Sequence, residues 1–231
     1  MKHPFGFLDR VTRTTNQEHG LHEVHSMKCV RWSGLAILSL LTSFLIGCAL
    51  FGPSPEEELQ EVAAGTDHEE KREVLQEIEP TPEMFPTLAG MLSREPDPTV
   101  RAMAAKAIGT LQWPKAVDEL RKAVKKDPHW IVRQRALAAL GNTIDGEIEQ
   151  DLAYVLENDA DHRVRVEAVR LAEEWLPPET AFDTLLTALQ DDSDAVRLQA
   201  ARALEGITDQ SLPPRYEPWK EYLSVESGSG E

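Results

Sequence analysis

The sequence predicts an all-α fold, an α-solenoid of stacked antiparallel helix pairs with a 32-residue period. A Val-Arg pair recurs at residues 100–101, 132–133, 164–165 and 196–197, so every step is 32 residues. An alanine stands three residues after each of these arginines, and a leucine recurs at the same step upstream, at 88, 120 and 152. A fixed step in three independent columns indicates a repeat architecture, in which each unit buries its apolar face against its neighbours.

Each unit is predicted to contain two helices. In the second helix of one unit, Val132, Ala136, Ala139 and Leu140 occur at i, i+4, i+7 and i+8, which is the pattern of a half-buried helix. An Asp or Ser ahead of this pattern can accept a hydrogen bond from a free N–H of the first turn. The alanines of the second helices let neighbouring helices approach closely.

Two glycines stand near the ends of predicted second helices. Because a left-handed residue often closes a helix, we expect Gly109 and Gly141 to be left-handed caps.

The predicted repeat domain covers residues 67–207. Residues 67–78 align with 97–108 but are more polar, as a terminal unit facing water should be. Residues 208–231 are predicted to be a C-terminal cap and frayed tail, in which aromatic side chains such as Trp219 cover the last exposed core face.

The Asp-x-x-Val-Arg starts, the alanine column and the Ala-Leu-Gly end resemble HEAT repeats, specifically the short bacterial kind that recurs in cyanobacterial bilin-lyase-like proteins. The period is shorter than the ~40–47 residues typical of HEAT units. The third unit has Glu173 and Glu174 in place of the glycine, and His129 stands where Asp is expected. Tetratricopeptide repeats have a nearby period, but their Trp-x-x-Leu-Gly pattern is missing.

The resemblance gives the repeated arginines a structural role. In HEAT proteins the equivalent Arg and Asp pair between neighbouring units and hold the stack in register, which we favour over ligand binding. The residues of this ladder are Arg101, Arg133, Arg165 and Arg197.

Residues of the second helices that break the repeat are better candidates for contact with a partner, because packing between units does not require them. The candidate partner-binding residues are Trp130, Arg135, His162, Arg163, Arg170 and Arg202.

The chain is acidic, with 40 Asp and Glu against 24 Lys and Arg and a net charge of -16. This balance argues against nucleic-acid binding, which depends on clustered Lys and Arg. It favours a protein partner that presents a basic segment to the concave surface of the solenoid.

No catalytic residue, metal site or cofactor is expected in residues 48–231. The segment has no Ser-His-Asp set, Gly-rich phosphate loop or metal cluster, and its three histidines fall in different repeats. His68-Glu69 resembles the His-Glu pairs of iron-binding HEAT-like hydroxylases, but the other histidines lack such a pair. The alternative, a lyase or lyase-like subunit acting on a prosthetic group, rests on analogy of fold alone.

The N-terminal part has the layout of an export signal. No charged residue occurs from Trp32 to Pro55, and the basic residues Lys28 and Arg31 stand just before this uncharged stretch. Its end, Leu45-Ile46-Gly47-Cys48, resembles the lipobox of bacterial lipoproteins. The resemblance implies cleavage between Gly47 and Cys48, a lipid on the Cys48 thiol, and anchorage in the bacterial cell envelope.

The segments around this junction follow from that interpretation. Residues 27–47 form the signal peptide if translation starts at Met27, residues 1–26 are an upstream extension, and residues 48–66 are a tether and the start of a capping helix. Ala49, rather than Asp, follows the cysteine, which favours the outer over the inner membrane. The alternative is the same binding module anchored by an uncleaved membrane helix, for which Leu35 to Phe51 is short.

Overall fold

A computed structural model describes residues 53–143 and 148–228, and for residues 225–228 it describes the backbone alone. These residues all belong to the compact unit Ile46–Glu231. The predictions for the upstream extension, the signal peptide and the first residues of the tether lie outside the described residues.

Helices and turns make up the described residues, which contain no strand, so the predicted all-α class is confirmed. The helices are α1 (Pro55–Ala64), α2 (His68–Glu77), the 3₁₀-helix η1 (Pro82–Met84), α3 (Phe85–Arg94), α4 (Pro98–Thr110), α5 (Pro114–Lys126), α6 (Trp130–Gly141), α7 (Glu149–Asn158), α8 (His162–Trp175), α9 (Pro178–Ala188), α10 (Asp194–Thr208) and α11 (Tyr216–Gly228).

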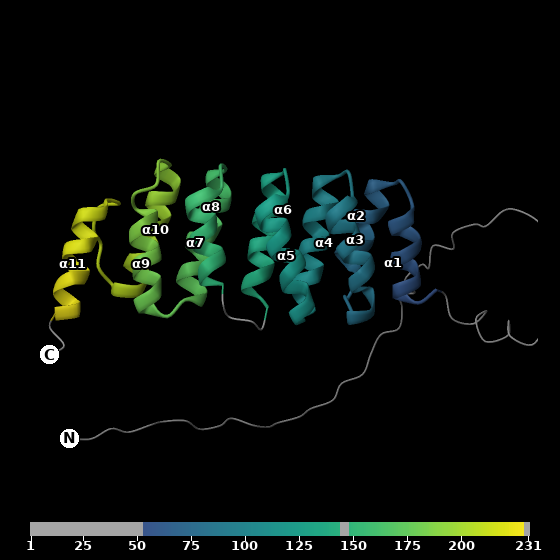
Figure 1. The fold of residues 1–231 in the computed structure, drawn as a ribbon, viewed down its shortest axis with the longest axis horizontal. Coiled ribbons are helices and arrows are strands. Elements are labelled where there is room, and N and C mark those ends of the chain that lie inside the picture. The colour runs from purple at the N-terminus through teal and green to yellow at the C-terminus, as the bar shows by residue number, and fades with distance from the viewer. Residues whose placement is uncertain (1–52, 144–147, 229–231) are drawn as a thin grey trace, which may run out of the picture. The chain divides into compact units, whose positions relative to one another are not determined.

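The helices stack in chain order from α1 at one end to α11 at the other (Figure 1). The odd-numbered helices α1 to α9 are the first helices of five pairs, and the even-numbered helices α2 to α10 are the second helices. Each second helix packs on the first helix of its own pair and on the second helices of the adjacent pairs. The last helix, α11, packs on α9 and buries Trp219 completely.

Repeated small and branched residues fill the core between the pairs. The four repeated alanines (Ala104, Ala136, Ala168 and Ala200) and the three repeated leucines (Leu88, Leu120 and Leu152) are all 0% exposed. Each buried leucine contributes about 1.5–3 kcal/mol to folding, whereas each alanine contributes little burial energy but lets the second helices lie close together.

The prediction of left-handed caps at Gly109 and Gly141 is wrong. Gly109 lies in the last turn of α4 and Gly141 is the last residue of α6, and neither has the positive φ of a left-handed residue. A Cβ built on Gly109 would lie 2.6 Å from Ala139 Cβ. The glycine is therefore needed because two second helices touch there, not because the chain turns.

A polar residue precedes each second helix, and the expected capping hydrogen bonds are made by the aspartates but not by the serine. The side chains of Asp97 and Asp161 accept hydrogen bonds from backbone N–H groups of the first turns of α4 and α8. His129 takes this place in α6, where its Nδ1 lies 3.4 Å from the backbone nitrogen of Ile131. Ser193 precedes α10 without a side-chain capping bond.

Replacing Gly109 with alanine should destabilise the array by about 1–3 kcal/mol, because the added methyl group collides with α6. Gly90→Ala is the matched control, since its added Cβ meets only the flexible Arg94 side chain. The control should be stabilising by up to about 1 kcal/mol through helix propensity alone. Urea unfolding of both variants checks this, and a Gly109→Ala variant as stable as Gly90→Ala would contradict it.

Candidate functional site

Ion pairs connect neighbouring helix pairs through the array and form an arginine ladder. In each rung, an arginine from the first turn of a second helix reaches an aspartate at or just past the end of the next first helix. The rungs are Arg101–Asp127 at 2.8 Å, Arg133–Asp159 at 2.7 Å and Arg165–Asp191 at 2.7 Å, measured from Nε to Oδ2.

The rung of Arg133 shows why the geometry is fixed. Its Nε and Nη2 donate to the two carboxylate oxygens of Asp159 at 2.7 and 2.8 Å, and its Nη1 donates to the carbonyl oxygen of Asp127 at 3.0 Å. Asp159 is the C-cap residue of α7, and its Oδ1 also accepts from the backbone N–H of Asp161 at 2.9 Å. The loop between α7 and α8 thus holds the carboxylate in place for the arginine of the preceding pair.

The ladder is largely shielded from water. The side chains of Arg133 and Asp159 are 15% and 4% exposed. The hydrogen bond to Asp159 raises the pKa of Arg133 above its ordinary value. Burial acts to raise the pKa of Asp191, but hydrogen bonds from Arg165 and the backbone of Ser193 outweigh it and lower the pKa. Such a carboxylate stabilises the fold above pH ~4, and this stabilisation is lost as the pH falls through its lowered pKa.

The two ends of the ladder differ from its middle. At the N-terminal end, Lys71 Nζ donates to Glu95 Oε2 at 2.7 Å, and both side chains are 5% exposed. Sequence reasoning missed this rung, although Lys71 stands four residues after Asp67, as Arg101 does after Asp97. At the other end, Arg197 binds the carbonyl oxygens of Asp191 and Asp192 and the carboxylate of Asp194, all within its own unit.

Three candidate partner-binding residues lie together at the start of α6 and α8. The guanidinium carbon of Arg163 lies 3.6 Å from the ring centroid of Trp130, which couples the two helices. Arg163 also donates to both carboxylate oxygens of Asp161, and this hydrogen bonding lowers the pKa of Asp161. His162 is exposed beside them. Trp130 and Arg163 are thus engaged with each other within the array.

The other three candidates lie along the exposed side of the second helices. Arg135 of α6 and Arg202 of α10 are exposed, and within the described residues neither makes a hydrogen bond or ion pair. Arg170 of α8 is tied to Glu167 and Glu174 of its own helix. Lys106 of α4, which sequence reasoning did not select, occupies the position equivalent to Arg170 and Arg202. We call the surface of Lys106, Arg135, Arg170 and Arg202 the second-helix surface.

Potential metal ligands do not gather in the part of the chain that the structure describes. Residues 53–143 and 148–228 contain no group of three or more His, Cys, Asp or Glu side chains that could hold an ion. His68 Nδ1 lies 2.8 Å from Glu95 Oε1, so it faces the end rung of the ladder rather than another histidine.

The residues of the expected lipid anchor, Gly47 and Cys48, lie outside the described residues. Among the helices that are described, none has both the length and the apolar character to cross a bilayer.

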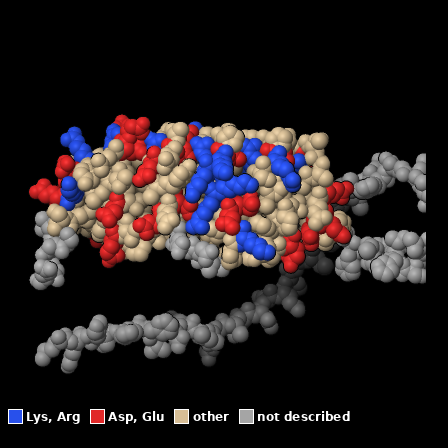
Figure 2. Space-filling model, in the orientation of Figure 1, with Lys and Arg blue, Asp and Glu red and all other residues tan. Residues whose placement is uncertain are grey.

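The charge of the array is unevenly distributed, which sequence reasoning also missed. Residues 98–141 carry nine Lys and Arg against three Asp and Glu, although the whole chain is strongly acidic. Figure 2 shows basic side chains gathered in the middle of one face, with some acidic side chains beside them and more toward both ends. The signal was present in the sequence as the run from Arg121 to Lys126, but the summed charge concealed it.

HEAT repeats are detected at residues 56–141 and 149–215, which together are more than half of the chain. The chain therefore belongs to the HEAT repeat family, whose members commonly mediate protein–protein interactions. No curated protein matches the chain.

Breaking a middle rung of the ladder should cost more than breaking its end. We expect Arg133→Ala to lower the free energy of unfolding by about 3 kcal/mol, because it leaves the shielded carboxylate of Asp159 without its partner. Arg197→Ala is the control and should cost about 1 kcal/mol or less, since Arg197 is 29% exposed and its partners all lie within one unit. Equal losses of unfolding free energy for the two variants in urea would show that the ion pair between helix pairs stabilises the fold no more than contacts within one pair.

Proposed function

We propose that this HEAT repeat protein is a binding scaffold without chemistry of its own, anchored in the bacterial cell envelope as a lipoprotein. The observation that carries the scaffold role is the second-helix surface, where the exposed Arg135 and Arg202 make no hydrogen bond or ion pair within the described residues. An exposed guanidinium that makes no hydrogen bond or ion pair within the described residues is available to a partner's carboxylate or carbonyl oxygen. An array of helix pairs repeats such positions along its length.

The charge pattern supports a partner whose own charges complement both the basic middle and the acidic ends of the array. A basic segment, as the net charge of the chain suggests, would lie against the acidic zones at either end of the array. Where the partner crosses Arg135 and Arg202, it would present carboxylates instead. Long-range attraction of this kind raises the association rate and weakens with salt.

The anchor is supported by the sequence around Cys48. An apolar run preceded by Lys28 and Arg31 ends in a small residue and a cysteine, as in lipoproteins. Six residues separate Cys48 from Pro55, the first residue of α1, and such a segment spans at most ~20 Å. The anchor would therefore keep the array close to the membrane, with the outer membrane favoured.

The anchor is tested by intact-mass analysis of protein extracted from membranes. The wild type should begin at Cys48 and carry an added mass of the size of lipid chains, and Cys48→Ala should lose it. Cys29→Ala is the matched control and should leave the mass of the mature protein unchanged, because Cys29 would be removed with the signal peptide. An unmodified wild-type chain that begins at Met1 would contradict the anchor.

The scaffold role is tested by placing a photo-cross-linking amino acid at Arg135 or at Arg202 in intact cells. The same protein should be captured from both positions, because both lie on the second-helix surface. Glu157 of α7, which is exposed on a first helix, is the control position and should not capture it. Absence of any protein adduct from both positions would contradict the proposal, and pigment absorbance in the purified protein would instead favour the lyase alternative.

A further inference from the structure

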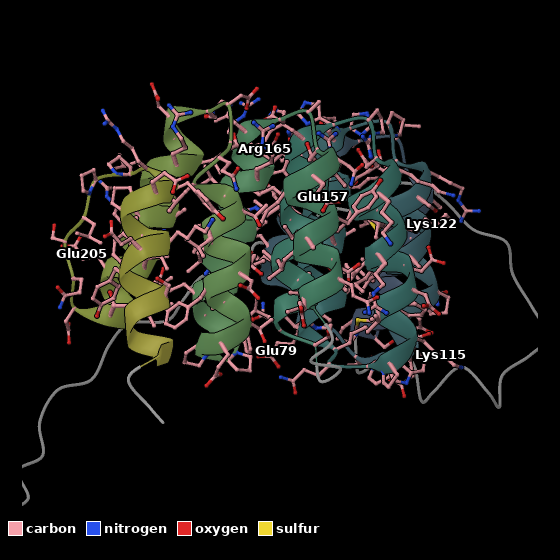
Figure 3. All side chains as sticks on the ribbon, turned by 60° about the vertical axis from the view of Figure 1, so that its left-hand side comes forward. Glu79, Lys115, Lys122, Glu157, Arg165 and Glu205 are labelled. Atoms are coloured by element: carbon pink, nitrogen blue, oxygen red, sulfur yellow. The ribbon has the colours of Figure 1, made fainter. Side chains whose placement is uncertain are left out.

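The first helix at the centre of the array, α5, carries a basic face that the proposed scaffold surface does not include. Its lysines at 115, 122, 125 and 126 are spaced so that they share one side of the helix, where Asp118 and Glu119 also lie between Lys115 and Lys122. Lys122 and Lys125 are 58% and 42% exposed. Figure 3 shows Lys115 and Lys122 on the outer edge of the same helix. We call Lys115, Lys122, Lys125 and Lys126 the α5 basic face.

Contacts within the chain neutralise these lysines only weakly. Lys122 Nζ lies 3.8 Å from Glu119 Oε2, and Lys125 Nζ lies 3.9 Å from Asp151 Oδ1 and 5.0 Å from the ring centroid of Tyr154. Lys126 makes no hydrogen bond or ion pair within the described residues. Exposed pairs at such distances are weak, so the lysines remain available to another molecule. Asp151 is already taken by Arg121, whose Nε lies 2.7 Å from it.

A shallow groove borders the α5 basic face. It has a volume of about 150 Å³ and lies between α3 and the end of α5, with Leu92, Ala123 and Pro128 among its walls. Lys122 and Lys126 also line it. A groove of this size accepts one aliphatic side chain, and the two lysines would flank the segment that carries that side chain.

The surroundings decide what kind of molecule can bind. On one side of α3 and α5, α1 carries four glutamates, and on the other side α7 and α9 carry exposed carboxylates such as Glu157 and Asp183. A flat anionic membrane or a nucleic-acid duplex would meet these carboxylates as well as the lysines and be repelled. A narrow occupant avoids them if it runs along α5, a helix of 13 residues that is ~20 Å long, with its carboxylates over Lys122, Lys125 and Lys126, past Asp118 and Glu119.

We propose that the α5 basic face and its groove form a docking site for an acidic segment of a partner protein, with one aliphatic side chain seated between α3 and α5. The segment is narrow, about as long as α5, and rich in Asp and Glu. The site needs neither the lipid anchor nor the second-helix surface, so it can fail without affecting the proposed function.

The test uses the purified full chain in detergent and two labelled 15-residue peptides. One peptide consists of Glu and Ala with a central Leu, and the other has Lys in place of each Glu. In fluorescence anisotropy at 50 mM salt, the acidic peptide should bind, and the double variant Lys122→Glu/Lys126→Glu should bind it at least tenfold more weakly. The matched control, Arg215→Glu/Lys220→Glu, reverses the same number of exposed basic side chains outside both surfaces and should bind it as the wild type does.

Three results of the peptide experiment would overturn the proposal. They are no binding of the acidic peptide, equal losses in the two double variants, or tighter binding of the basic peptide to the wild type. Circular dichroism of both variants checks that helical content is retained, which is expected because the substituted side chains are exposed.

A second measurement identifies the natural occupant. A photo-cross-linking amino acid at Ser93, which lines the groove and is exposed, should capture a segment with more Asp and Glu than Lys and Arg in intact cells. Capture of a basic segment, a lipid or a nucleic acid from Ser93 would overturn the proposal. Capture from Arg135 but not from Ser93 would also overturn it, and would leave the scaffold function standing.

Discussion

The fold depends on one repeated interaction, the bidentate ion pair between an arginine at the start of a second helix and an aspartate at the end of the next first helix. The aspartate accepts from the guanidinium and from a backbone N–H of its own loop, so one carboxylate both shapes a loop and fixes the next helix pair. Apolar burial drives the pairs together without specifying their angle, because it is not directional. The planar guanidinium supplies that direction.

The sequence predicted the helix pairs, their period and the alanine column, because each follows from a spacing that recurs along the chain. It failed where the cause lay in contact between distant residues. Gly109 resembles a helix cap in the sequence, but the reason for it is Ala139, thirty residues away on another helix. The rung of Lys71 and Glu95 was missed because the residue types differ from Arg and Asp while the geometry is the same.

For the candidate surfaces, too, some features could be predicted from the sequence and others depended on contacts between distant residues. Exposure of Arg135 could be predicted from its departure from the repeat, and that of Arg202 from the basic residues Lys106 and Arg170 at equivalent positions. The stacking of Arg163 on Trp130, by contrast, required the positions of two helices. The total charge of the chain is a poor guide to its surfaces, since nine of its basic residues fall in the 44 residues of 98–141. Charge is best counted helix by helix in an array whose units each face solvent.

The ladder also bears on how such a chain changes length. Every middle rung joins the arginine of one unit to the aspartate of the next. A duplicated unit would therefore bring an aspartate for the preceding unit and an arginine for the following one, and would need no compensating change elsewhere. The ends are different. The pair of Lys71 with Glu95 and the pair of Arg197 with the carboxylate of Asp194 occur once each among the described residues, and neither could be copied into the interior without breaking the Arg–Asp pattern. Gene duplication can therefore lengthen the middle of this protein, while its two ends have to be inherited intact.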